Sequence, residues 1–140
     1  DPLIIANSDQ YINWNSSKAF YDFNSKNLDG AILTFEAIHP KWSYAKCNKE
    51  GFVTEVAEKK VISKNATVGV YYWKHGSDYV LSAEEMIKKN IRVNNEFYVC
   101  PVYNQFLQKN KKIKIHKVDK MWGLGTPEDL INFNQKMKFD

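Results

Sequence analysis

The first 35 residues most constrain the fold, because they predict a strand, a helix and a second strand in close succession. Leu3–Ala6 is a short apolar run that predicts a fully buried strand. Apolar side chains at helical spacing predict a helix over Ser16–Ser25, and Ala31–Phe35 predicts a strand after the turn at Asp29-Gly30. This β–α–β order is typical of a crossover connection, so we expect an α/β fold with parallel strands.

The rest of the chain predicts more strands and helices and no linker or internal repeat. Strands are expected at Tyr44–Cys47, Phe52–Ala57, Thr67–Trp73 and Ile113–Val118, with the first two forming a hairpin. Helices are expected over Ser77–Lys89, from Pro101 to Gln108 and from Thr126 onward, and a loop at Trp122–Gly125. Val80, Ala83, Met86 and Ile87 are expected on one face of their helix. We therefore predict one α/β domain with a mixed sheet over residues 1–140.

The composition argues against a nucleic-acid partner and against a membrane span. Lys and Arg number 20 against 16 acidic residues, for a net charge of +4, and only Arg92 is an arginine. Arginine is the usual residue for bidentate contacts with guanine or phosphate, so a dedicated nucleic-acid reader is not expected. No apolar run approaches the ~18–20 residues that a membrane span needs.

The two cysteines indicate neither a zinc site nor a disulfide framework. Cys47 and Cys100 lie far apart, and neither belongs to a CxxC pair or has a histidine nearby at ligand spacing. Isolated thiols are typical of a reducing compartment, so we expect a cytoplasmic protein.

Asp9 is the first candidate site residue, because it lies just past the predicted strand Leu3–Ala6. Open α/β sheets place their ligands at the carboxyl ends of such strands. A carboxylate there can hold Mg²⁺, which takes few protein ligands. An Asp that only caps the following turn is the structural alternative.

Three further segments place polar residues at the ends of predicted elements. Glu58-Lys59 follows a predicted strand and suits a sugar phosphate, although a surface ion pair needs the same residues. Glu96 precedes an aromatic stretch and either binds a hydroxylated ligand or supports its own loop. Gly123–Leu130 sets two glycines before a helix, which suits a phosphate or an ordinary capped helix.

In their order along the chain, these segments resemble the sugar-phosphate nucleotidyltransferases, also called nucleotide-sugar pyrophosphorylases. The likeness is greatest to the branch found in bacterial capsule and surface-polysaccharide operons. The matching segments are Asn7–Gln10, Ser43–Ala45 with Gly51–Lys59, Asn65–Tyr71, Asn94–Tyr98 and Gly125–Leu130. The resemblance implies a three-layer, Rossmann-like mixed sheet of the GT-A or nucleotidyltransferase type. It also implies that residues 1–140 are the C-terminal, acceptor-binding portion of one domain.

The resemblance implies a reaction between an NTP and a sugar 1-phosphate that gives an NDP-sugar and pyrophosphate. Asp9 and Lys59 are the implied catalytic residues, Asp9 as the ligand of Mg²⁺ and Lys59 as the cation that neutralises the acceptor phosphate. The implied sugar-phosphate pocket consists of Glu58, Lys59, Tyr44, Thr67, Gly69, Tyr71 and Glu96.

Two positions depart from the pattern of the family. Gly123 stands where the family commonly has a second metal-binding Asp, and Asp119 is out of register to replace it. Asn94 stands where some relatives have a phosphate-binding Arg. The Gly-rich nucleotide loop of the family is expected before Asp1. We therefore expect this chain alone to be inactive and to need a missing N-terminal half, or to form a homo-oligomer.

Two other functions stay open at this point. A GT-A glycosyltransferase would use an NDP-sugar, but its Asp-x-Asp pair is represented only by Asn7-Ser8-Asp9, which supplies one acid. A non-catalytic subunit that retained the fold would agree with the glycine at position 123.

Overall fold

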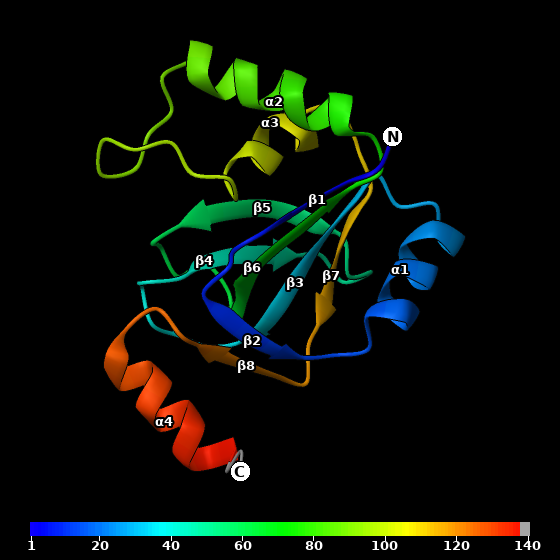
Figure 1. Ribbon diagram of the computed structural model, residues 1–140. Coiled ribbons are helices and arrows are strands. Elements are labelled where there is room, and N and C mark those ends of the chain that lie inside the picture. Colours follow the sequence, from blue (N-terminus) through cyan, green and yellow to red (C-terminus); the bar gives the residue numbers. More distant parts are fainter. Residues whose placement is uncertain (138–140) are drawn as a thin grey trace.

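The computed structural model describes residues 1–137, which form eight strands and four helices (Figure 1). The strands are β1 (Leu3–Ala6), β2 (Gln10–Asn13), β3 (Gly30–Glu36), β4 (Ser43–Cys47), β5 (Val53–Glu58), β6 (Asn65–Trp73), β7 (Ile113–Lys117) and β8 (Lys120–Gly123). The helices are α1 (Ser16–Ser25), α2 (Gly76–Lys88), α3 (Val102–Leu107) and α4 (Pro127–Met137).

Six strands form one mixed sheet in the order β5-β4-β6-β3-β7, and β1 adds to β6 beside this path. Among the strands of the described residues only β3 and β7 pair in parallel, whereas β1 and β3 each pair with β6 in antiparallel fashion. The predicted β–α–β unit therefore exists, but its two strands do not pair with each other. The reason is that β6, with nine mainly β-branched and aromatic residues, occupies the place between them.

Strand β6 bends at Gly69, where the backbone has a φ of 86°. The pairing of β6 with β3 shifts register across this point, because Ile32 pairs with Tyr71 and Thr34 with Thr67. Glycine adopts such a positive φ without the penalty that a side chain brings. The bend divides β6 into one half that pairs with β4 and another that pairs with β1.

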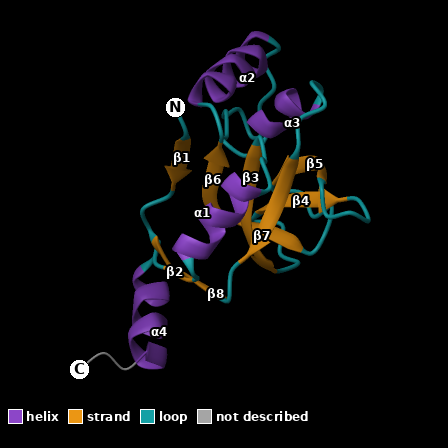
Figure 2. Ribbon diagram, turned by 90° about the vertical axis from the view of Figure 1, so that its right-hand side faces the viewer, coloured by secondary structure: helices purple, strands orange, loops and turns teal. Residues whose placement is uncertain are grey.

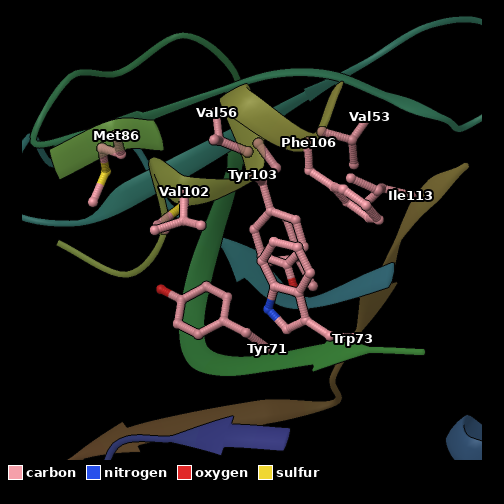
Figure 3. Close-up of a cluster of buried hydrophobic side chains, with 12 residues drawn as sticks. Val53, Val56, Tyr71, Trp73, Met86, Val102, Tyr103, Phe106 and Ile113 are labelled. Carbon is pink, nitrogen blue, oxygen red and sulfur yellow. The ribbon is translucent and has the colours of Figure 1, made fainter. Parts of the chain in front are cut away.

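Helices cover both faces of the sheet, which confirms the three-layer mixed α/β fold. In Figure 2, α1 lies in front of the sheet, while α2 and α3 lie together at one end. Alternate residues of β3 serve the two faces: Ala31 and Leu33 pack with α1, and Ile32 packs in the cluster of α2 and α3. At the centre of that second cluster the rings of Trp73 and Tyr103 stack with centroids 4.2 Å apart (Figure 3).

A second, two-stranded sheet was not predicted from the sequence. Strand β2 pairs with β8 in antiparallel fashion, so the expected loop at Trp122–Gly125 begins inside a strand. Both strands have four residues and are only partly buried, and such short segments carry little periodicity. Tyr11 and Trp122 of this sheet both contact Phe133, which joins α4 to it.

The apolar face predicted for α2 is only partly buried. Met86 is buried, but Val80 and Ile87 are 50% and 54% exposed. The helix packs against α3, so the buried side of α2 is the one that carries Ser82 and Met86. Within residues 1–137, no helix is long and apolar enough to span a membrane.

The stacked core makes a first prediction. Trp73→Ala should lower the free energy of unfolding by about 3–5 kcal/mol, because it removes a fully buried indole and leaves a cavity beside Tyr103. Tyr21→Ala is the control, since Tyr21 is 71% exposed and its loss should cost within about 0.5 kcal/mol. Urea denaturation measures both values, and equal midpoints for the two variants would contradict this account of the core.

Candidate functional site

The candidate site lies beside the bend of β6, where two strands meet along the same edge. Strand β4 pairs with β6 at Ala66, and β1 pairs with it from Val70 to Trp73. Both flanking strands can be followed beside β6 in Figure 1. The residues between these pairings border a cavity of about 210 Å³. Such a break in strand order is a common place for a ligand in an α/β fold.

Four of the residues implied by the resemblance line this cavity together. Glu58 comes from the end of β5, and Thr67, Gly69 and Tyr71 come from β6. The cavity also has six lining residues that were not singled out as pocket residues from the sequence: Asn7, Gln10, Lys41, Trp42, Ser43 and Val68. Asn7, Gln10, Ser43 and Val68 lie within the segments that carry the resemblance, whereas Lys41 and Trp42 lie outside them.

Lys59 and Glu96 lie outside the cavity lining, and both interact with the side chain of Tyr98. The Lys59 Nζ lies 5.2 Å from the centroid of the Tyr98 ring. The Glu96 side chain hydrogen-bonds with the Tyr98 hydroxyl, which raises the pKa of Tyr98. The charge of Glu58 acts on that hydroxyl too, so Tyr98 links the two predicted residues to the edge of the cavity.

Tyr44 is placed away from the cavity. Its side chain is fully buried, and its hydroxyl donates to the His39 carbonyl at 2.6 Å. Side chains alternate along a strand, so Ser43 faces the cavity while its neighbour points to the other side. In this structure Tyr44 therefore holds the loop before β4.

Hydroxyl groups form a hydrogen-bonded chain under the cavity. The Tyr71 hydroxyl lies 3.1 Å from Thr67 Oγ1, Thr67 hydrogen-bonds with Ser43, and Ser43 hydrogen-bonds with Glu58. An ionised carboxylate only accepts, so Ser43 donates to Glu58, Thr67 to Ser43 and Tyr71 to Thr67. Burial raises the pKa of Tyr71, which keeps this hydroxyl protonated. The chain fixes the position of the Glu58 carboxylate.

The Glu58 carboxylate is half-buried, and its charge is therefore costly. Burial raises the pKa of Glu58, although the charge of Lys59 and the hydrogen bond from Ser43 oppose this shift. The buried Cys100 thiol also belongs to this surrounding, and burial raises its pKa to about 12. Cys100 is accordingly a neutral thiol and not a nucleophile.

Gly69 leaves space for the side chain of Asn7, the residue that follows β1. The Asn7 N–H donates to the Gly69 carbonyl at 2.9 Å. A Cβ on Gly69 would lie 2.7 Å from Asn7 Cγ, which is closer than real contacts allow. Because Gly69 has no side chain, the Asn7 amide can lie beside it at the cavity.

Asp9 lies next to the loop before α4. The Leu124 N–H donates to the Asp9 carbonyl at 2.8 Å, and the Asp9 Oδ2 would lie 2.9 Å from a Cβ on Gly125. The second glycine of this loop therefore gives space to a carboxylate. The Asp129 Oδ2 would lie 3.8 Å from a Cβ on Gly123, so an acid from α4 approaches the position where the family's second Asp was expected.

Asp9 is the residue that the resemblance implies as a metal ligand. Among residues 1–137, no three His, Cys, Asp or Glu side chains gather as a metal cluster. Magnesium keeps several waters and takes one or two carboxylates plus phosphate oxygens. The exposed Asp9 carboxylate could be the one ligand that the protein supplies to such an ion.

Glu58 makes a prediction on pH dependence. Its folded-state pKa is raised above the ordinary value of 4.5, so the carboxyl stabilises the fold at low pH and this contribution is lost as pH rises through the folded-state pKa. Glu58→Gln carries no such charge. Its stability relative to the unchanged chain should therefore increase from about pH 4.5 upward. Urea denaturation of both proteins at a series of pH values measures the difference, and a constant difference would contradict the raised pKa.

The solved structures that resemble this one include the following two. A nucleoside-diphosphate-sugar pyrophosphorylase from Vibrio cholerae matches 96% of this chain with a TM-score of 0.81 and 23% sequence identity. A protein provisionally assigned as a glucose-1-phosphate thymidylyltransferase from Bacillus anthracis, in complex with sucrose, matches 100% of it with a TM-score of 0.74 and 15% identity. The matches span 56% of each of those chains.

No protein-family model matches the sequence, and no curated protein matches it. At these identities the structural likeness concerns the fold. This chain therefore has the mixed α/β fold of the nucleotidyltransferase structures, over about half of their length.

Proposed function

We propose that this chain binds a sugar 1-phosphate as the acceptor half of a nucleotidyltransferase that makes an NDP-sugar and pyrophosphate. The observation that carries the proposal is the cavity at the bend of β6. It gathers Glu58, Thr67, Gly69 and Tyr71, four residues of the pocket implied by the resemblance, in a matching fold.

The size and chemistry of the cavity suit one sugar ring. Its volume of about 210 Å³ lies below the usual range of about 300–1,000 Å³ for drug-sized ligands, which agrees with a single sugar ring as its occupant. The Glu58 carboxylate accepts hydrogen bonds from hydroxyl groups but repels phosphate. The phosphate therefore lies toward the lysines, with Lys41 in the cavity lining and Lys59 just outside it.

In the proposed reaction the protein mainly orients the two substrates and neutralises the charge of their phosphates. A phosphate oxygen of the sugar 1-phosphate attacks the α-phosphorus of the NTP in line, and pyrophosphate leaves. Glu58 orients the sugar through its hydroxyls, and the hydroxyl chain from Tyr71 keeps that carboxylate in place. Lys59 and Lys41 neutralise the acceptor phosphate as it approaches a second anion.

Asp9 is the residue proposed to hold Mg²⁺. When bound, the ion would supply charge neutralisation at the phosphates. Asp9 lies two residues after Asn7 of the cavity lining and is fixed by the hydrogen bond from Leu124. It is thus placed between the sugar site and the loop before α4.

We infer three finer points from the resemblance. The NDP-sugar serves the synthesis of a bacterial capsule or surface polysaccharide in the cytoplasm. Sugar 1-phosphate binding is expected of this chain, but turnover is not, because its cavity holds one ring and the NTP needs a site of its own. A partner half or a second copy of the chain would provide that site.

Titration calorimetry with a panel of sugar 1-phosphates tests the proposal. At least one should bind, and Glu58→Gln should weaken its Kd by about 10- to 100-fold, as expected for a lost hydrogen bond to a charged group. Glu84→Gln, on the exposed side of α2, is the matched control and should leave the Kd unchanged.

Three results would contradict the proposal. They are no binding of any sugar 1-phosphate, equal binding by Glu58→Gln, and preference for an NDP-sugar over the sugar 1-phosphate. The last result would favour a glycosyltransferase.

A further inference from the structure

Two amide side chains line the cavity without a hydrogen-bond partner in the described part of the chain. The Asn7 side chain is exposed at the cavity and makes no hydrogen bond with residues 1–137, whereas Gln10 Nε2 is hidden from solvent without an acceptor. A hidden, unpaired amide such as that of Gln10 costs about 1–3 kcal/mol. Groups of this kind in a folded protein call for an explanation, and an acceptor on a ligand is one.

Backbone hydrogen bonds fix the positions of the two residues that carry these amides. Asn7 is held beside Gly69 by the bond from its own N–H and by the space that the glycine leaves. Gln10 begins β2, where it pairs with Gly123 of β8. Neither side chain is on a long free loop, so each amide has a defined place before a ligand arrives.

The amides and the carboxylate come from different sides of the cavity. Asn7 and Gln10 follow β1, whereas Glu58 ends β5 on the side of β4. Amide nitrogens donate hydrogen bonds, and the carboxylate only accepts them. A sugar ring between them can donate one hydroxyl to Glu58 and accept at another hydroxyl from an amide.

We propose that Asn7 and Gln10 select the epimer of the bound sugar by donating hydrogen bonds to its hydroxyl oxygens. This inference rests on the proposed function, because it concerns the sugar in the same cavity. Inverting one hydroxyl moves its oxygen away from the amide and leaves the amide unpaired. Sites that hydrogen-bond a hydroxyl reject analogues that do not present it, whereas apolar pockets discriminate weakly.

The test compares the Kd of the 1-phosphates of glucose, galactose and mannose, because galactose and mannose each differ from glucose at a single hydroxyl. The unchanged chain should prefer one of them by at least about tenfold. Asn7→Ala or Gln10→Ala should reduce this ratio to within about threefold, with weaker binding of the preferred sugar. Asn24→Ala, at an exposed position of α1, should keep the ratio.

Gly69→Ala gives a second, independent variant. Its Cβ takes the place of the Asn7 amide, so it should lower the same ratio as Asn7→Ala does. Urea denaturation checks that each variant is folded.

The outcomes separate this inference from the proposed function. Binding of no sugar 1-phosphate overturns both. Binding of all three epimers with equal affinity overturns the role of the amides alone. An unchanged epimer ratio in both alanine variants, Asn7→Ala and Gln10→Ala, also overturns it, even if affinity falls.

Discussion

The bend of β6 at Gly69 is the constraint on which the candidate site depends. A straight β6 would pair with one long strand along this edge. The positive φ instead ends the pairing with β4 and starts the pairing with β1, and the cavity lies between the two. The same glycine leaves space for Asn7. One residue without a side chain thus creates the gap and sets a polar group beside it.

The packing of the core around β6 explains how the side chains of the candidate site are held in place. The stack of Trp73 on Tyr103 fixes the end of β6 from within the core, and Tyr71 extends the same strand toward the cavity. In Figure 3 the Tyr71 hydroxyl points away from that stack. The hydroxyl chain then continues to Glu58. Core packing and the position of the carboxylate are therefore connected through one strand.

The sequence predicted the long, strongly apolar elements well, because burial on both faces leaves a clear pattern. Thr67–Trp73 is an example, and it lies within β6. The pairing of β1 with β6 was not predictable, since it depends on contacts far apart in the chain. Glu58 and Thr67 were found through a resemblance of motifs, whereas Lys41 carried no local signal that separates it from a surface residue.

The small sheet of β2 and β8 connects Asp9 to the C-terminal helix. Its two short strands pair with each other, and neither pairs with a strand of the six-stranded sheet. Leu124 bonds to Asp9 and Phe133 packs on Tyr11, while Ile12 and Met121 pack against the core on the α1 side. The position of the acidic residue is therefore set by α4 as well as by the larger sheet.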